Sequence, residues 1–147
     1  MKTFQGRVVA PGTVTAEALV SHNGLNTLAS FQKALQFGDK NATCGDQNNP
    51  DLYGKQMVGK ALCLPQTIGS TTGGLVLYCA CAMNRRPACM LFSHPIDSLA
   101  GAGVILADIW LNGEKMPVVD SLGDEFLQYV QTGATVTVQE NGVVVVD

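Results

Sequence analysis

The sequence is poor in charge, in basic clusters and in long apolar runs. Charged residues make up 14% of its 147 residues, and nine basic against twelve acidic side chains give a net charge of −3. Without a basic run, the chain lacks a face that neutralises nucleic-acid phosphates, so we expect no nucleic-acid partner. No apolar stretch approaches the ~20 residues that span a bilayer, so we expect no membrane role. The first seven residues contain no apolar signal segment, which predicts a cytoplasmic protein.

Apolar residues, by contrast, are plentiful. They make up 46% of the sequence, and no repeat, linker or low-complexity segment divides the chain. A chain of this length can bury a sizeable core without metal or disulfide crosslinks. We therefore predict a single domain over residues 1–147.

The five cysteines do not form a recognisable framework. Their number is odd, and disulfide frameworks are typical of short secreted chains with even counts. Cys79 and Cys81 are separated by one residue rather than two, and no histidine stands at ligand spacing, so we expect no metal site within this chain. We interpret Cys63, Cys79, Cys81 and Cys89 as small core residues. Cys44 lies in a polar stretch and is predicted to be the only exposed thiol.

The pattern of apolar and turn residues predicts a mixed α/β domain with a layered sheet. Strands are predicted at 4–10, 17–20, 57–64, 89–92, 104–110, 117–119, 135–139 and 143–146, and helices at 28–35, 75–83, 97–102 and 124–131. Asn141-Gly142 between two runs of β-formers predicts a hairpin. Residues 38–55 predict a long loop, for which a functional or interface role and a plain solvated surface are equally open.

The turn between the predicted strand 57–64 and helix 75–83 is the best candidate for chemistry. A helix start presents unpaired N–H groups and a positive dipole end, so it binds anions. Gly69 permits a sharp turn, and Ser70 or Thr71 is predicted at or just before the helix cap, with its hydroxyl in the anion site. Helix capping alone remains an equally simple explanation. No Lys follows in P-loop order, and Ser70 lacks the Gly-x-Ser-x-Gly spacing of a hydrolase.

Other titratable residues do not form an active site by themselves. His22 and His94 are far apart in sequence, and each is predicted in a surface or turn position. Asp46 and Asp51 lie in a turn-rich run where Asx-turn hydrogen bonds are the simplest role. Residues 124–125 are acidic and favour the start of the last helix. The chain is therefore part of a catalyst, or it is not a catalyst at all.

The order and spacing of several short segments resemble the swivelling domain of the aconitase X family, from the N-terminus to about Trp110. The segments are Gly6–Gly12, Ala16–Ser21, Gly59–Pro65, Gly69–Gly74, Ala88–Phe92 and Gly103–Ala107. The resemblance implies a single swivelling β/β/α domain, like the small mobile domain of aconitases. It also implies docking on a separately encoded large catalytic subunit, which carries the iron–sulfur cluster, so that this chain alone binds no cofactor.

The same resemblance assigns roles in the dehydration of a small hydroxy acid. Ser70 corresponds to the family's catalytic base, and the neighbouring Gly69, Thr71 and Thr72 are expected to bind substrate. A serine hydroxyl is a weak base unless its alkoxide is stabilised, and a helix N-terminus in a closed site can supply that stabilisation.

Two departures from the family pattern bear on the substrate. Aconitases proper have an arginine soon after this serine, whereas Thr71-Thr72-Gly73 follows Ser70 here, so that carboxylate contact does not carry over. Segment 24–54 is also longer than in many members. Because residues 65–74 contain no Lys or Arg, cis-3-hydroxy-L-proline is the favoured substrate. The small subunit of a mevalonate 5-phosphate dehydratase and a non-catalytic anion-binding module are the alternatives.

Overall fold

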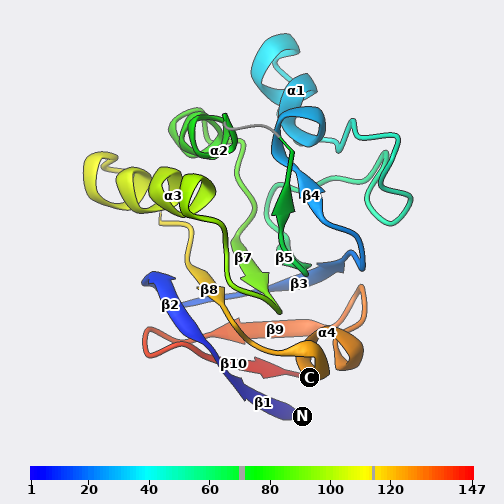
Figure 1. Cartoon of the computed structure of the whole chain (residues 1–147), viewed down its shortest axis with the longest axis vertical. Helices are drawn as coiled ribbons and strands as arrows, with labels where there is room; N and C mark the ends of the chain where they lie inside the picture. Colours follow the sequence, from blue (N-terminus) through cyan, green and yellow to red (C-terminus); the bar gives the residue numbers. More distant parts are fainter. Residues whose placement is uncertain (70–71, 114) are drawn as a thin grey trace.

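The computed structural model describes residues 1–69, 72–113 and 115–147. These residues form the following strands and helices (Figure 1): β1 (Lys2–Gln5), β2 (Arg7–Ala10), β3 (Val14–Val20), β4 (Leu25–Asn26), α1 (Thr27–Phe37), β5 (Ala61–Leu64), β6 (Thr67–Ile68), α2 (Gly73–Ala82), β7 (Cys89–Phe92), α3 (Ser98–Trp110), β8 (Val118–Asp120), α4 (Asp124–Tyr129), β9 (Thr135–Val138) and β10 (Val143–Val146). No helix within these residues is long and apolar enough to cross a membrane.

The main sheet is nearly closed on itself. Its eight strands follow the order β1-β10-β9-β3-β5-β7-β8-β2, so its two ends are β1 and β2, which are consecutive in the chain. The predicted single strand 4–10 is therefore wrong, because the chain turns at Gly6 from one end of the sheet to the other. A Cβ at Gly6 would lie 2.5 Å from Val119 Cγ1 and 2.6 Å from the Asp120 carbonyl oxygen, so glycine is required there.

Parallel strands and crossover helices build the upper half of the molecule. β3, β5, β7 and β8 are parallel neighbours, and α1, α2 and α3 connect them in turn. All three helices pack on one side of these parallel strands. The rest of the sheet curls round so that β1, β9 and β10, together with α4, lie on the opposite side; we call these elements the β half (Figure 1). This arrangement confirms the predicted α/β fold class.

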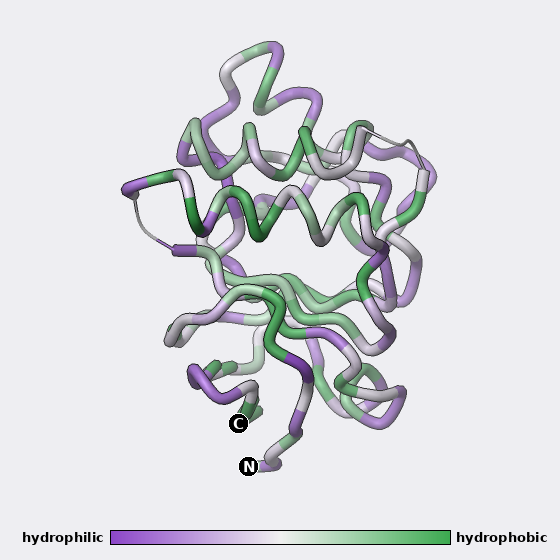
Figure 2. Tube along the Cα trace, turned by 60° about the vertical axis from the view of Figure 1, so that its left-hand side comes forward, coloured by the Kyte–Doolittle hydropathy of each residue, from purple (hydrophilic) through white to green (hydrophobic). Residues whose placement is uncertain are grey.

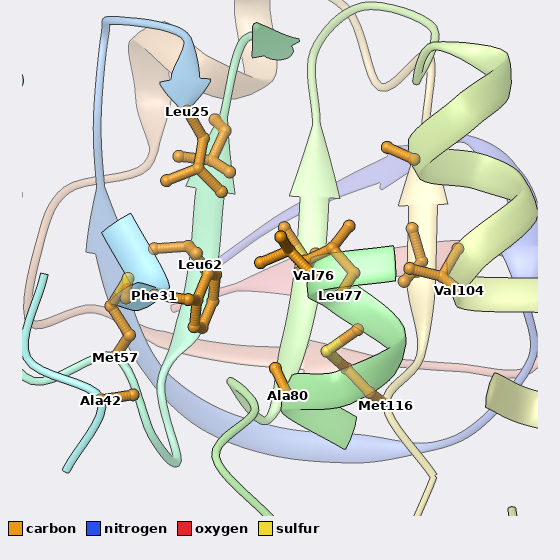
Figure 3. Packing of buried hydrophobic residues seen from close by; sticks show 14 of the residues in the cluster. Leu25, Phe31, Ala42, Met57, Leu62, Val76, Leu77, Ala80, Val104 and Met116 are labelled. Carbon is orange, nitrogen blue, oxygen red and sulfur yellow. The ribbon is translucent and has the colours of Figure 1, made fainter. Parts of the chain in front are cut away.

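Two apolar clusters fill the two sides of the sheet. Along β5, Leu62 and Leu64 contact the helical cluster, whereas Ala61 and Cys63 belong to the cluster on the opposite side. This alternation is typical of a strand that is buried on both faces. Figure 3 shows the helical cluster, in which Phe31 and other side chains from α1 to α3 lie over the central strands.

The β half covers the second apolar cluster, on the side of the parallel strands away from the helices. The predicted hairpin is confirmed: β9 pairs with β10, Gly142 has a φ of +87°, and Asn141 Oδ1 accepts the Val143 N–H at 3.2 Å. Helix α4 begins at Asp124, as predicted, and ends at Tyr129, two residues before its predicted end. The ring of Phe126 makes an edge-on contact with Phe4 at 5.3 Å between centroids.

Helix α3 differs most from the sequence expectation. The sequence pattern predicts a helix at 97–102 followed by a strand at 104–110, but Ser98–Trp110 is one continuous helix. A short apolar run fits a buried strand and a buried helix equally well. Gly103 does not interrupt the helix; instead it allows α3 to cross α2, because a Cβ there would lie 2.0 Å from the Gly74 carbonyl oxygen.

The long loop after α1 is folded against that helix rather than merely solvated. Ala42, Cys44, Leu52 and Met57 are fully buried in the helical cluster. The prediction of an exposed Cys44 is therefore wrong, because the loop folds back over this side chain. Strand β5 is also shorter than the predicted 57–64, since the chain turns at Gly59 with a φ of +76° before Ala61.

The remaining cysteines divide into two pairs. Cys63 and Cys89 are buried between the parallel strands and the β half, as predicted. Cys79 and Cys81, on α2, are only partly buried, so the prediction of four core cysteines holds for two of them.

Candidate functional site

Three strand-to-helix connections end at the same edge of the sheet. The carboxyl ends of β3, β5 and β7 lead to the N-termini of α1, α2 and α3, which begin at Thr27, Gly73 and Ser98. In open α/β sheets, ligands bind in the crevice outside this edge, where helix N-termini and connecting loops meet. The fold therefore places the predicted turn beside two other helix starts.

A cavity of about 350 Å³ lies where these helix starts meet. All of its lining residues come from the three connections or from the first turns of the helices: Thr27, Thr67, Ile68, Gly69, Gly73, Asp97, Leu99 and Ala100. Each helix N-terminus contributes a partial positive charge and oriented N–H groups. The arrangement is suited to an anionic group such as a carboxylate.

The turn at Gly69 is held over the start of α1. Leu25 and Asn26 of β4 pair in parallel with Thr67 and Ile68 of β6, so the chain enters the turn beside the α1 cap. Gly69 has a φ of +98°, and a Cβ there would lie 3.0 Å from Asn26 Nδ2. The predicted sharp turn at Gly69 is thus confirmed, and a side chain at this position would be strained by the positive φ and would crowd the Asn26 side chain.

The first turns of two of these helices are capped by polar side chains at the cavity. Asn26 Oδ1 accepts the Ala29 N–H at 3.1 Å, and Asp97 Oδ2 accepts the Ala100 N–H at 3.0 Å. The other Asp97 oxygen accepts a hydrogen bond from the Thr67 hydroxyl, which links β6 to α3. These bonds fix the relative positions of two sides of the cavity.

Helix α2 begins two residues earlier than the predicted 75–83. Thr72 occupies the N-cap position, and its carbonyl oxygen accepts the Val76 N–H at 3.0 Å. Gly73 lines the cavity with backbone only. Of the predicted site residues, Gly69 therefore lines the cavity and Thr72 stands at its border, while Ser70 and Thr71 lie outside the described residues.

An ion pair between the buried Asp120 and the exposed Arg7 supports the α3 side of the cavity. Asp120 is fully buried, accepts from Arg7 Nε at 2.9 Å, and accepts the Ile96 N–H at 2.8 Å. Burial alone raises the pKa of the Asp120 carboxyl, but the hydrogen bonds from Arg7 and Ile96 outweigh it and hold that pKa below its usual value. Because Ile96 directly precedes Asp97, this carboxylate positions the cap of α3.

The histidines and the acidic loop residues lie elsewhere. His94 is exposed and its Nε2 lies 3.2 Å from Asp124 Oδ1, and the His22 N–H donates to Asp51. Asp46 accepts the Asn48 N–H at 3.0 Å, as expected of an Asx turn. None of these residues lines the cavity.

The donor groups of the described residues do not fit an iron–sulfur cluster. No three Cys, His, Asp or Glu side chains among them are grouped as metal ligands. Burial raises the pKa of the Cys89 thiol to about 12, which disfavours the thiolate that a cluster requires. The described residues therefore supply no set of ligands for a cluster.

Sequence reasoning missed three polar residues of the cavity wall, namely Thr27, Thr67 and Asp97, and the neighbouring cap of α1, Asn26. A signal was present in the sequence. Asn26 precedes the predicted helix 28–35 by two residues, Asp97 begins the predicted helix 97–102, and each follows a predicted strand. Taken together, these junctions between strand and helix cap predict that the caps meet at one shared edge of the sheet.

Comparison with known proteins agrees with this geometry. A model of the aconitase X swivel domain family matches residues 3–146. The phosphomevalonate dehydratase small subunit of Methanocella arvoryzae is 27% identical over 135 residues, which cover 92% of this chain and 91% of that protein. The crystal structure of holo-form aconitase X from Thermococcus kodakaraensis shares the fold, with a TM-score of 0.81 and 24% identity over 100% of this chain and 99% of that one.

A relative of different length also matches. The cis-3-hydroxy-L-proline dehydratase of Pseudomonas aeruginosa is 28% identical over 120 residues, which cover 82% of this chain but 19% of that protein. The chain belongs to the aconitase X swivel domain family, and it is a subunit of a hydro-lyase of the aconitase X type.

Proposed function

We propose that this chain is the small subunit of an aconitase X dehydratase and that it works on a small hydroxy acid together with a separate large subunit. The observation that carries this proposal is the cavity at the three helix N-termini, in a chain of this family. The cavity is open on one side of the domain and contains no complete set of catalytic groups among its described lining residues. A second subunit is needed to enclose the substrate and complete the site.

Ser70 is proposed to act as the base. It stands in the chain between Gly69, which lines the cavity, and Thr72, which caps α2. In the proposed reaction, the alkoxide of Ser70 takes a proton from a substrate carbon, and the bond between the adjacent carbon and its hydroxyl group breaks. The proton passes on to the departing hydroxide, so that the products are an alkene and water and the Ser70 alkoxide is restored. The positive end of α2 supports this role, because it stabilises negative charge on the serine oxygen.

Gly69, Thr71 and Thr72 are proposed to bind the substrate. Backbone groups at a glycine-rich helix start can approach a carboxylate closely, and threonine hydroxyls can donate to it. The iron–sulfur cluster implied by the family resemblance is proposed to belong to the large subunit. The donor groups described above support this division, since they do not fit a cluster.

For the substrate, we propose cis-3-hydroxy-L-proline. The described lining residues of the cavity include one carboxylate, Asp97, and neither lysine nor arginine. A carboxylate attracts the ring ammonium of hydroxyproline and repels a phosphate group. The relative from Pseudomonas carries the name of this activity.

Mevalonate 5-phosphate is the second candidate. It is favoured by the Methanocella small subunit, which matches this chain over nearly its whole length, whereas the hydroxyproline enzyme is a much longer protein. In this case the large subunit supplies the cations that bind the phosphate.

The test is anaerobic reconstitution of this chain with the aconitase X large subunit of the same organism, followed by dehydration assays on both compounds. We expect turnover only from the pair, with a higher kcat/KM for cis-3-hydroxy-L-proline. Preference for mevalonate 5-phosphate would select the second candidate. A pair that binds either compound without turnover would favour the anion-binding module.

A further inference from the structure

The outer surface of α2 and α3 carries more apolar side chains than a solvent-exposed helix surface normally does. Helix α2 contains no charged residue, and α3 contains one, Asp108. A surface helix normally presents polar side chains to water, as α1 does with Gln32, Lys33 and Gln36. Figure 2 shows the contrast, with α2 and α3 drawn mainly in green and pale colours.

The exposed apolar side chains of these two helices line a groove. Its volume is about 400 Å³, and its walls include Leu75, Tyr78, Leu99, Leu106 and Trp110, which we call the α2–α3 face. Leu75 and Trp110 are each 64% exposed. Tyr78 and Trp110 contact each other edge to face with ring centroids 6.4 Å apart, so the rim of the groove is preformed.

The backbone holds this groove in a fixed shape. A Cβ at Gly74 would lie 2.1 Å from the Leu99 carbonyl oxygen, so the two helices are in direct backbone contact at one end of the groove. Two helices locked in this way present their side chains at fixed spacing. A preformed apolar groove lowers the entropic cost of binding a partner.

The groove is continuous with the cavity at the helix N-termini. Leu99 lines both, and Gly73 and Gly74 line one each. A protein that covers the α2–α3 face therefore also reaches the border of the cavity, where the proposed reaction needs groups that this chain does not supply.

We propose that the α2–α3 face is the docking surface for the large subunit, an inference that rests on the proposed function. The Pseudomonas relative supports this occupant, because its matched region makes up 19% of its length and most of that chain is available to cover the domain. The absence of charge on α2 fits an apolar partner surface. A second copy of this chain fits less well, because it would cover the cavity border with another incomplete site.

The test measures association of this chain with the large subunit of the same organism, using Leu75→Glu and Trp110→Glu. Both side chains are mostly exposed, so circular dichroism should show an intact fold. A charge placed in an apolar contact should raise the Kd of the pair at least ~30-fold. Turnover should recover at high concentrations of the variant chain, because the face binds the partner and does not react. Phe37→Glu, at the end of α1 and 77% exposed, is the matched control and should leave the Kd unchanged.

Three results would overturn the proposal. If the wild-type chain binds the large subunit and the pair is active, but both glutamate variants bind as tightly as wild type, the docking surface lies elsewhere and the proposed function stands. If sedimentation shows that the free chain dimerises and that Leu75→Glu breaks the dimer without weakening the pair, the face belongs to a second copy. If the wild-type subunits neither associate nor turn over substrate, the docking surface and the proposed function fail together.

Discussion

The β half and the helical half of the molecule differ in how they meet the solvent. In β9 and β10 buried valines alternate with more exposed positions, and β1 pairs with the free edge of β10. In the helical half, α2 and α3 are apolar on the inside and on much of the outside. The β half is therefore complete within this chain, whereas the helical half has surface and chemistry that another subunit must complete.

The largest effect is expected from a substitution that forces α2 and α3 apart. We expect Gly103→Ala to lower the free energy of unfolding by about 3 kcal/mol, because its Cβ would lie 2.0 Å from a backbone oxygen of Gly74. Urea unfolding of the free chain measures this change.

The matched control lies in the same helix. A Cβ at Gly101 would meet only ordinary contact, with Ile96 Cγ2 lying 3.5 Å away. Gly101→Ala should be neutral or should stabilise by up to about 1 kcal/mol, since alanine favours helix. Equal losses for the two substitutions would show that helix crossing is not the reason for Gly103.

Next in size is the ion pair that joins the N-terminal strands to the cavity wall. Asp120→Asn should cost about 2 kcal/mol at neutral pH, because the buried carboxylate loses the charge-assisted hydrogen bonds that it accepts from the exposed Arg7 and from the Ile96 N–H. The pKa of Asp120 is lower in the folded chain than its usual value, so its contribution is present above about pH 4 and is lost as the pH falls through the folded pKa.

Unfolding measured from neutral to acid pH tests both parts of this prediction. The wild-type chain should lose stability on acidification by more than Asp120→Asn does. Asp124→Asn, which removes an exposed carboxylate, should follow the wild-type curve closely. Parallel curves for wild type and Asp120→Asn would contradict the assigned role.

A smaller effect is expected at the cap of α1. Asn26→Ala should cost about 1 kcal/mol, because the Ala29 N–H loses its acceptor. Asn26→Asp keeps an acceptor oxygen in the same place and should retain most of the stability. Thermal unfolding of the three chains tests this role, and an equal loss of stability in Asn26→Ala and Asn26→Asp would contradict capping by the side-chain oxygen.

The smallest effect is expected on the outer face of the β half. The hydroxyls of Thr15 and Thr137 lie 3.1 Å apart on exposed neighbouring strands. Removing either with alanine should change stability by less than about 1 kcal/mol. A double-mutant cycle measures the coupling free energy between the two hydroxyls. A coupling larger than about 1 kcal/mol would contradict a simple solvent-exposed role for this surface.

Local features could be predicted from the sequence because neighbouring residues determine them. The hairpin follows from Asn141-Gly142, and β7 has the bounds predicted for it, since its four buried residues lie between a proline turn and polar residues. The turn at Gly69 also follows from a single residue type.

Features that depend on distant contacts were missed. Gly103 is a helix breaker by propensity, but its partner Gly74 explains why it lies inside α3. Cys44 has polar neighbours in sequence, yet the loop carries it against α1. In the site, the sequence indicates one helix start as a candidate anion site, whereas the approach of Asn26 and Asp97 depends on the order of the parallel strands.

The most direct test of the central claim is the turnover of the assembled dehydratase with Ser70→Ala. If this turn supplies the base, turnover should fall by about 10²- to 10⁴-fold while the subunits still associate with wild-type affinity. Ser98→Ala, at the exposed start of α3, is the matched control and should remain active. Wild-type turnover by Ser70→Ala, in a pair that assembles normally, would contradict the account and leave this chain a role in binding alone.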